Sequence, residues 1–502
     1  MIGMIVLRFL VLLFLLFSGS TFGATYRFIV PKDGLNSELQ QAKVVHSLDP
    51  LPWVVVESEK KIDSGFRDLT GHISLATQST TPSSSSQWLS SLCASDVWSK
   101  TTGDGLIIAL IDTGVDWTHE GLSGNVLYDK GYDFGDNDHD PSDENGHGTL
   151  MAGLIAGNCM NSKGFCGVAP NAKIIPFKIN RGGEGSFYSS DLAAAIIAAA
   201  TTEASIINLS LTIDSEVEWV KAAIEYARSR GKIVVAAAGN SGMEVAVPAR
   251  FSTVIGVGAI DANNHLIQAS NRGEGLSLVA PGLDLMSTWL GHSYIGVTGT
   301  SPAAAIVSGV IALYMSSYPN DAPENIMARV LESAVDLYNP GFDPQSGFGL
   351  VNACSLASKD GSQGNPDVPR VKLGFSGDQG LSYGDRLEVS LSLINVSGGY
   401  GDIAIRINGP IDYDGRRTNT YYTWPGIASS EPVLFTQPFG SPVLFTEDIE
   451  NFVLVGAKEA PLGDGIIPSG LPEGPYEIGV GLVLNGTLYT ARKVIWIRPT
   501  GL

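Results

Sequence analysis

Apolar runs alternate with helical patterns through the middle of the chain. Five of these runs have the length of single strands and hold few charged residues: 106–111, 172–179, 205–211, 233–238 and 254–260. Strands that are apolar on both faces and alternate with helices are typical of a parallel sheet with helices packed on both sides. The pattern therefore predicts an α/β domain built on a doubly wound, mostly parallel sheet.

Two helices are clearly marked within this pattern. Ser215 and Glu218 have the spacing of a capping box, so we expect one helix to begin with Ser215 as its cap and to stop at Gly231. The other is an alanine-rich segment that opens at Ser301 and runs to about residue 317. Both fit the alternation of strands and helices.

The first 24 residues have the pattern of a secretory signal peptide. Residues 9–17 form a short apolar core behind Arg8, and small residues follow up to Ala24. This core is far shorter than the roughly 20 residues that span a bilayer, and a small-residue exit is typical of a cleavage site. The pattern predicts export, to the extracellular space or the periplasm, with no transmembrane segment in the mature chain. An uncleaved membrane anchor is the alternative.

The pattern changes again after residue 358. Residues 359–370 predict a linker, and beyond it apolar and polar residues alternate, as in residues 386–394 and 402–408. Asn485-Gly486 supplies the two positions of a type I′ turn, so residues 476–484 and 487–497 predict a hairpin. Residues 371–502 are therefore predicted to form an antiparallel β-sandwich.

Composition narrows the classes of function. The chain has 502 residues, of which 44% are hydrophobic, so it can form several domains with large cores. Its 31 Lys and Arg against 51 Asp and Glu give a net charge of −20, which argues against nucleic acid as a partner. Four cysteines are too few for a disulfide scaffold. Cys159 and Cys166 are close enough in sequence to pair, whereas the pairing of Cys93 and Cys354 cannot be read from the sequence.

Four residues with catalytic chemistry follow apolar strands or open helices. Asp112 ends a strand, His147 lies in Asn-Gly-His-Gly-Thr, Asn240 follows a strand, and Ser301 opens the alanine-rich helix. A serine hydroxyl becomes nucleophilic when an imidazole removes its proton, and a carboxylate orients that imidazole. An Asn side chain and a backbone N–H can stabilise the oxyanion that forms. We therefore predict Asp112, His147 and Ser301 as a catalytic triad, with Asn240 in the oxyanion hole.

These segments resemble those of the subtilisin-like serine peptidases, the subtilases, in the Asp, His, Ser order of that family. Further blocks that match the family are Val247-Pro248-Ala249, Ala280-Pro281-Gly282 and Gly347-Phe348-Gly349. The resemblance covers residues 87–358 and implies a subtilisin-like fold that hydrolyses peptide bonds in proteins or peptides. It also implies that an extended substrate pairs with the chain at the candidate substrate-binding residues Leu209, Ser210, Leu211 and Thr212.

Some positions depart from the family pattern: Leu150, Thr212, Pro302 and Ala305. We expect these changes to adjust packing and the cleft rather than to remove the chemistry. A catalytically inactive, subtilase-like binding protein is one alternative. Another is a surface- or glycan-binding protein that acts through the β-sandwich, whose Tyr421, Tyr422 and Trp424 could line a glycan face.

Residues 25–86 occupy the place in which the family carries a propeptide. The resemblance implies that this segment assists folding and acts as an intramolecular inhibitor until it is removed. Residues 79–86 contain only Ser, Thr and Pro, as expected of an exposed, cleavable linker. A small independent N-terminal domain is the alternative. The predicted order is thus a signal peptide at 1–24, a propeptide-like segment at 25–86, a peptidase domain at 87–358, a linker at 359–370 and a β-sandwich at 371–502.

An acidic loop precedes His147. Clustered carboxylates on a loop suit calcium, and some subtilases bind calcium in this loop. We therefore predict a stabilising Ca²⁺ held by Asp136, Asp138 and Asp140, while catalysis requires no cofactor. A solvated acidic loop is the alternative. An EF-hand is excluded, because Pro141 stands where that motif requires glycine.

Overall fold

The computed structural model describes the chain from residue 26 to residue 354, except for residues 35–41, 60–64, 75–76, 80–84, 161–162, 252, 274 and 339–342. Beyond residue 354 it describes strand segments between residues 370 and 498, without their side chains. The predicted signal peptide and the linker at 359–369 lie outside the described residues. The described part from 26 to 354 divides between two compact units, Met1–Leu69 and Thr70–Leu502.

The first unit contains a four-stranded antiparallel sheet in the order β2-β3-β1-β4. Its strands are β1 (Tyr26–Pro31), β2 (Lys43–Ser47), β3 (Trp53–Ser58) and β4 (Phe66–Arg67), with a short 3₁₀ helix η1 (Lys32–Gly34) after β1. Alternate residues of β1 and β3 face the same side, and four of them form a small buried core: Phe28, Val30, Val54 and Val56.

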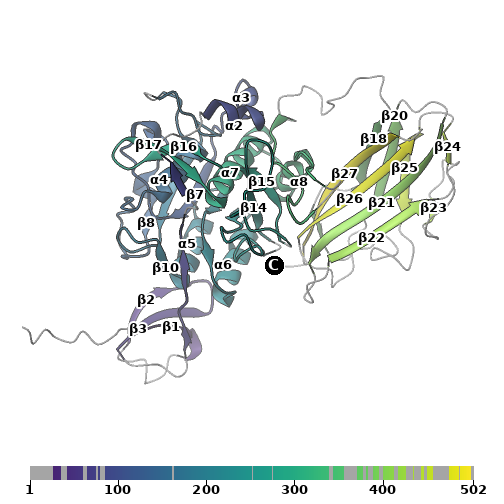
Figure 1. Ribbon diagram of the computed structural model, residues 1–502. Helices are drawn as coiled ribbons and strands as arrows, with labels where there is room; N and C mark the ends of the chain where they lie inside the picture. The colour runs from purple at the N-terminus through teal and green to yellow at the C-terminus, as the bar shows by residue number, and fades with distance from the viewer. Residues whose placement is uncertain are drawn as a thin grey trace, which may run out of the picture. The chain divides into compact units, whose positions relative to one another are not determined.

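The second unit is built on a seven-stranded sheet in the order β15-β14-β13-β11-β7-β9-β8 (Figure 1). Every pair of neighbours in it is parallel. The strands are β7 (Ile107–Asp112), β8 (Tyr132–Asp133), β9 (Lys173–Lys178), β11 (Ile206–Leu209), β13 (Ile233–Ala237), β14 (Ile255–Ile260) and β15 (Leu278–Pro281). Each of the five predicted apolar runs forms one of them, so the predicted parallel sheet is confirmed.

Helices cover both faces of this sheet (Figure 1). They are α4 (His147–Ala156), α5 (Ser189–Thr201), α6 (Glu218–Ser229) and α7 (Thr300–Ser317). The helix α8 (Pro323–Ser333) packs on α7, and two short 3₁₀ helices are η3 (Glu120–Leu122) and η4 (Tyr128–Lys130). The helix α7 packs on five strands of the sheet, β7, β11, β13, β14 and β15, and is buried from Thr300 to Tyr314. By length and composition it could cross a membrane, but 83% of it is buried inside the fold, as in the core helix of a globular domain.

The predicted cap of α6 is wrong. The helix begins at Glu218, with Val217 in the capping position and no side chain that caps it. Ser215 lies outside the helix, and its neighbour Glu216 pairs with Arg250 at 3.2 Å. At the other end Gly231 follows the helix with a φ of 77°, a left-handed conformation that glycine adopts readily, so this stop is confirmed.

Two short sheets lie outside the main sheet. One places β5 (Thr70–His72) between β10 (Ser186–Tyr188) and β12 (Thr212–Ile213). The other joins β16 (Leu285–Trp289), β17 (Ser293–Thr298) and β6 (Thr77–Ser79). Strands from residues 70–79 therefore extend both sheets, although the sequence places these residues in the propeptide-like segment.

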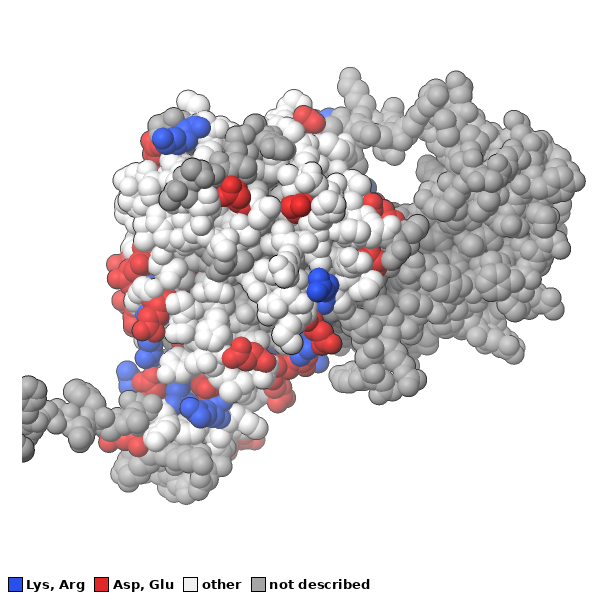
Figure 2. Space-filling model, in the orientation of Figure 1, with Lys and Arg blue, Asp and Glu red and all other residues white. Residues whose placement is uncertain are grey.

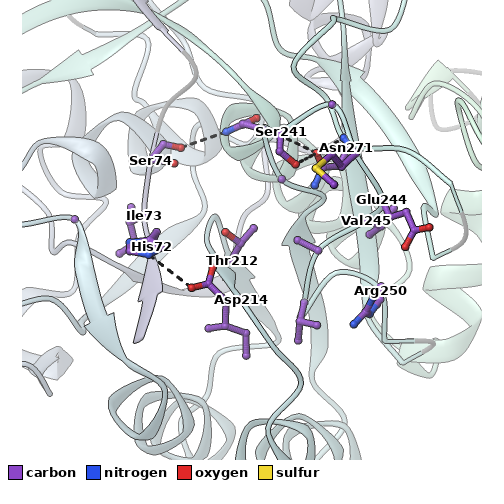
Figure 3. A pocket seen from close by; sticks show the side chains of 18 of the residues that line it. His72, Ile73, Ser74, Thr212, Asp214, Ser241, Glu244, Val245, Arg250 and Asn271 are labelled. Carbon is purple, nitrogen blue, oxygen red and sulfur yellow. Dashed lines mark hydrogen bonds and ion pairs between the residues drawn. The ribbon is translucent and has the colours of Figure 1, made fainter. Parts of the chain in front are cut away.

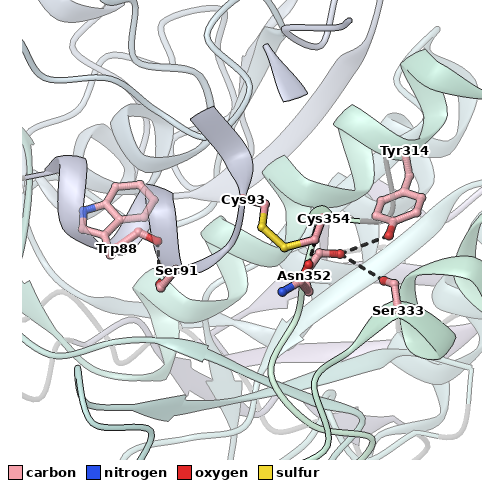
Figure 4. Close-up of a disulfide and its surroundings, with 7 residues drawn as sticks. All are labelled: Trp88, Ser91, Cys93, Tyr314, Ser333, Asn352 and Cys354. Carbon is pink, nitrogen blue, oxygen red and sulfur yellow. Dashed lines mark hydrogen bonds between the residues drawn. A yellow bond between two sulfur atoms is a disulfide. The ribbon is translucent and has the colours of Figure 1, made fainter. Parts of the chain in front are cut away.

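Two disulfides join the described cysteines: Cys159–Cys166, which are close enough in sequence to pair, and Cys93–Cys354. Cys93 lies between the short helices α2 (Ser85–Ser91) and α3 (Ala94–Val97). Ala353 N–H also donates to Leu92 O at 2.9 Å, beside the disulfide. The hydroxyls of Tyr314 and Ser333 donate to Asn352 O (Figure 4). Residues 352–354 are therefore fixed to the chain between α2 and α3, and to the helices α7 and α8.

The strands after residue 370 form two sheets in the orders β18-β20-β25-β23 and β19-β27-β26-β21-β22. Their bounds are β18 (Arg370–Ser376), β19 (Gly380–Ser382), β20 (Glu388–Ile394), β21 (Gly399–Ile411), β22 (Arg417–Trp424), β23 (Val433–Leu434), β24 (Val443–Phe445), β25 (Ile449–Val455), β26 (Gly474–Leu484) and β27 (Thr487–Arg498). The predicted hairpin is present, because β26 and β27 pair antiparallel up to Leu484 and Thr487. The β-sandwich itself stays a prediction, and the side chains of Tyr421, Tyr422 and Trp424 lie outside the described residues.

Candidate active site

A buried pair of Asp112 and His147 lies at the carboxyl end of the strand β7. His147 Nδ1 is 2.7 Å from Asp112 Oδ1, and the two side chains are 3% and 0% exposed. A neutral imidazole that donates from Nδ1 keeps the lone pair of Nε2 available as a base. Nε2 of His147 and Oδ2 of Asp112 are buried and have no hydrogen-bond partner among the described residues. This pair can therefore accept a proton from a group placed at Nε2.

Asp143 fastens the start of α4 to the end of β7. Its carboxylate accepts hydrogen bonds from Thr113 Oγ1 at 2.9 Å and from Thr149 Oγ1 at 2.6 Å, besides three backbone N–H groups of residues 145, 146 and 149. Thr113 Oγ1 in turn accepts from Gly148 N–H at 2.9 Å. Burial raises the pKa of Asp143, although its hydrogen bonds act to lower it. In the sequence Asp143 is one of several acidic residues before His147, and no local pattern predicts this role.

Gly146 is required immediately before His147. Its φ is 102°, and a Cβ at this position would lie 2.5 Å from the ring of Trp289. Only glycine adopts this left-handed conformation without strain and leaves room for the ring. The residue thus allows the chain to turn sharply into α4, whose first side chain is His147.

Ser301 is the second residue of α7, is 3% exposed, and faces the backbone of Ser210. Ser301 Oγ donates to Ser210 O at 3.1 Å, and Ser210 Oγ donates to Ser301 O at 3.0 Å. Beneath them Asn208 Nδ2 donates to Ser210 Oγ at 2.9 Å. Ser308 Oγ donates to Asn208 Oδ1 at 2.8 Å. These buried bonds tie α7 to β11 and fix the backbone of Ser301.

Asn240 and Ser301 converge on one carbonyl oxygen, that of Ser74. Asn240 Nδ2 lies 3.3 Å from Ser74 O, and Ser301 Oγ lies 3.5 Å from it. Thr300 turns the amide in this direction, because its N–H and its hydroxyl both donate to Asn240 Oδ1. The structure thus joins Asp112 to His147 by a hydrogen bond and places Asn240 and Ser301 at the same carbonyl oxygen.

A cleft with a volume of about 1340 Å³ adjoins this carbonyl (Figure 3). Thr212 and Asn240 are the predicted site residues that line it, together with His72, Ser74, Ser241 and Met243. His72 Nε2 is 3.9 Å from Asp214 Oδ2 across it. Leu209 and Leu211 are buried, at 0% and 2% exposure, and Ser210 lies under Ser301. Of the four predicted substrate-binding residues, Thr212 therefore reaches the cleft directly.

The residues predicted to bind calcium do not fit a calcium ion. Asp138 Oδ1 accepts from Asp140 N–H, and Asp140 Oδ1 accepts from Tyr128 Oη and Ser142 N–H. Hydrogen bonds from Ser142 and Tyr128 hold the pKa of Asp140 below its usual range. Within the described ranges, no three His, Cys, Asp or Glu side chains are grouped as metal ligands.

Lys178 supplies the positive charge in this region. Its Nζ is 2.6 Å from Asp133, 3.5 Å from Asp136 and 3.6 Å from Glu144, while its side chain is 3% exposed. Burial lowers the pKa of Lys178, but these carboxylates outweigh burial and raise it on balance.

On the visible face of the described part, acidic and basic side chains are interspersed and form no broad basic patch (Figure 2).

Comparison with known proteins agrees with this geometry. Residues 103–349 match the model of the subtilase family. The chain is 45% identical to the thermophilic serine proteinase of Bacillus sp. (strain AK1) over 45% of this chain and 56% of that protein. It is 35% identical to the M-protease of Shouchella clausii (strain KSM-K16), over 62% of this chain and 81% of that protein. It is 34% identical to the halolysin-like extracellular serine protease Nep of Natrialba magadii, over 61% of this chain and 57% of that protein.

Proposed function

The chain belongs to the subtilase family of serine endopeptidases, and we propose that it hydrolyses peptide bonds of protein or peptide substrates with Asp112, His147 and Ser301 as its triad. The observation that carries this proposal is the buried hydrogen bond from His147 Nδ1 to Asp112 Oδ1, which leaves Nε2 without a partner among the described residues. An imidazole held in this way can act as the general base that activates a serine hydroxyl.

In the proposed reaction Ser301 Oγ attacks the substrate carbonyl and His147 Nε2 takes its proton. The hydroxyl now donates to Ser210 O, so it must first turn toward the imidazole. Asp112 stabilises the imidazolium, which then gives the proton to the leaving amine. Water, deprotonated by His147, hydrolyses the ester of Ser301 and releases the acid. Asn240 Nδ2 and the Ser301 N–H stabilise the oxyanion in both steps.

Pro302 is compatible with this chemistry. It lies at the third residue of α7, in the first helical turn, where a backbone N–H has no partner within the helix. The N–H proposed as oxyanion donor belongs to Ser301, which keeps it. The departure from the family pattern at this position therefore removes no donor that the reaction uses.

Export of the protein is also proposed. Both disulfides require an oxidising compartment, which agrees with the predicted signal peptide. One relative is named as an extracellular protease. We assign residues 25–86 to a propeptide that inhibits the enzyme, because its strands β5 and β6 pair with strands of the peptidase domain.

A fluorophosphonate probe tests the proposed activity. It should label Ser301 of the wild type and leave Ser301→Ala unlabelled, with hydrolysis of casein lowered on the order of 10⁶-fold. The matched control is Ser316→Ala, which alters a serine of the same helix whose exposed hydroxyl donates to Asp104 O, away from Ser301. Labelling that persists in Ser301→Ala would contradict the assignment and favour another nucleophile. A wild type that takes up no label would favour the inactive binding protein.

A further inference from the structure

Asn240 lies on a loop that leaves the main sheet after β13. Residues 239–243 form this loop, which we call the oxyanion loop, and Gly239 and Gly242 within it have positive φ values of 107° and 68°. Such a loop has no regular ladder of hydrogen bonds of its own, so its backbone N–H groups need acceptors elsewhere in the fold. The position of Asn240 therefore depends on the residues that supply those acceptors.

The side chain of Asn271 is such an acceptor, and it is 3% exposed. Its Oδ1 accepts hydrogen bonds from the N–H and from the hydroxyl of Ser241, both at 2.9 Å (Figure 3). Met243 N–H donates to the same oxygen at 3.1 Å. A carbonyl oxygen has two lone pairs, so three donors at these distances saturate it. Asn271 thus fixes the part of the oxyanion loop that follows Asn240.

Backbone contacts join Asn271 to the other end of the loop and to the sheet. Asn271 N–H donates to Gly239 O at 2.9 Å, and a Cβ on Gly239 would lie 2.4 Å from Asn271 Nδ2. The neighbouring Ser270 Oγ accepts from Ala259 N–H of β14 at 3.0 Å. Gly239 N–H donates to Thr300 Oγ1 at 3.0 Å. The oxyanion loop is therefore held between Asn271, beside the sheet, and Thr300 at the start of α7.

We propose that Asn271 is a positioning residue for the hydrolysis: by holding Ser241 and Met243, it keeps Asn240 Nδ2 directed at the carbonyl oxygen that faces Ser301. The inference rests on the proposed function, because Asn271 acts through the oxyanion donor Asn240. Thr300 orients the amide of Asn240, whereas Asn271 fixes the backbone beside it. The loss of either residue should weaken the same donor.

The distance at the carbonyl explains why small movements of the oxyanion loop matter. Asn240 Nδ2 is 3.3 Å from Ser74 O, which is long for an N–H···O hydrogen bond. An oxyanion donor acts best at about 2.7–3.1 Å from the oxygen on which charge develops. A displacement of about 1 Å can lower a rate by about 10²-fold. A loop that Asn271 no longer holds should therefore donate poorly in the transition state.

The first test compares steady-state hydrolysis of a peptide substrate by the wild type and by Asn271→Leu, whose side chain has a similar size and no acceptor. Titration to completion with fluorophosphonate gives the concentration of active enzyme, so that a loss of stability does not enter kcat. We expect kcat to fall about tenfold or more and KM to stay within about twofold of wild type, because an oxyanion donor acts mainly in the transition state.

A second variant keeps the test valid if Asn271→Leu fails to fold. Asn271 lines the cleft, so in Asn271→Ala water can enter and bond to the freed N–H groups of residues 241 and 243. The same fall in kcat is expected, because a mobile water does not hold the loop as a fixed side chain does.

The matched control is Asn125→Leu. Asn125 is also buried, at 5% exposure, and its Nδ2 donates to Ala156 O at 2.8 Å and to Pro170 O at 2.7 Å. None of these three residues lines the cleft. Asn125→Leu should therefore lower Tm and leave the kcat of the active enzyme at its wild-type value.

A double-mutant cycle with Asn240→Ala separates positioning from a purely structural role. A residue that acts through the amide of Asn240 has nothing to position once that amide is removed. Asn271→Leu should therefore change kcat by less than about twofold in the Asn240→Ala background. A purely structural role would lower kcat by the same factor in both backgrounds.

The outcomes separate this inference from the proposed function. Wild-type kcat in the Asn271 variants overturns the inference, and so does an equal loss of kcat with and without Asn240. A rise in KM with unchanged kcat would assign Asn271 to substrate binding and overturns it as well. In these cases the wild type still labels with fluorophosphonate and digests casein, so the proposed function stands. A wild type that neither labels nor digests casein overturns the proposed function and this inference together.

Discussion

Thr300 holds the side chain of Asn240 through two hydrogen bonds to its Oδ1, from the backbone N–H at 2.9 Å and from the hydroxyl at 3.1 Å. An amide rotates freely unless its oxygen or nitrogen is fixed. Because the oxygen is held, Nδ2 points to Ser74 O in the cleft. A proposed oxyanion donor is thus oriented by the residue that precedes the proposed nucleophile.

Asn240→Ala should lower kcat by about 10²- to 10³-fold and leave KM nearly unchanged, since an oxyanion donor acts mainly in the transition state. Steady-state hydrolysis of a peptide substrate measures both constants. Thr300→Ser keeps the N–H and the hydroxyl and serves as the control, with kcat close to the wild-type value. A rise in KM with unchanged kcat in Asn240→Ala would assign Asn240 to substrate binding instead.

Asp143 makes stability depend on pH in a defined direction. Because burial raises its pKa in the folded protein, the folded state binds this proton more tightly than the unfolded chain does. The stability that this tighter proton binding gives the folded protein is fully present below pH 3.8, the ordinary pKa of the group. It is lost as the pH rises through the raised pKa of the folded state. Asp143→Asn has no such proton, so its deficit in unfolding free energy against wild type should narrow as pH rises from 3.8.

Urea denaturation of both proteins in the Ser301→Ala background, which prevents self-digestion, measures this difference across the acid range. Asp129→Asn, a change at an exposed acidic side chain outside the hydrogen bonds of Asp143, is a suitable control and should show a constant difference. A deficit of Asp143→Asn that widens with rising pH would mean that ionised Asp143 is the stabilising form.

Lys178→Met should lower the free energy of unfolding by about 3–5 kcal/mol, because it leaves the buried carboxylate of Asp133 without its cation. Thermal denaturation in the Ser301→Ala background measures the loss. Lys130→Met is the control, since Lys130 pairs with Glu203 on the surface and its loss should cost about 1 kcal/mol or less.

Any effect of calcium on thermal stability should not depend on Asp138 and Asp140, two of the ligands predicted from the sequence. Asp138→Asn and Asp140→Asn should leave any shift of Tm between calcium and EGTA at its wild-type size, because these side chains bond to neighbouring backbone and to Tyr128. Calorimetry with and without EGTA provides the measurement. A calcium-dependent shift that disappears in Asp138→Asn would restore the calcium site predicted from the sequence.

The parallel sheet and the positions of Asp112, His147 and Ser301 could be predicted because each rests on a local pattern. An apolar run of strand length identifies β7, and Asp112 is simply the residue that ends it. The pair of Asp112 and His147 follows once two such segments meet at one edge of the sheet. These features need no knowledge of which polar groups meet in three dimensions.

Other features depend on such meetings and were missed. Asp143 looks like one more acid of the loop, and its role requires Thr113, which is distant in sequence. Lys178 lies within an apolar run, and nothing local shows that it turns toward Asp133 and Asp136. Residues 70–74 carry no strong strand pattern, because two other strands supply the pairing that makes β5. The prediction that Ser215 caps α6 was wrong. The local capping-box pattern is present, but the helix begins only at Glu218, and Glu216 next to Ser215 pairs with Arg250, which is distant in sequence.

The bond between Cys93 and Cys354 turns the peptidase segment into a covalently closed ring. A protease that nicks its own surface loops normally falls apart into fragments. Here a single nick anywhere between these two cysteines opens the ring without releasing a piece, because both new ends remain linked through the sulfur atoms. On a denaturing gel the nicked chain therefore runs as one piece until a reductant breaks the disulfide. The nicked molecule can keep its packed core.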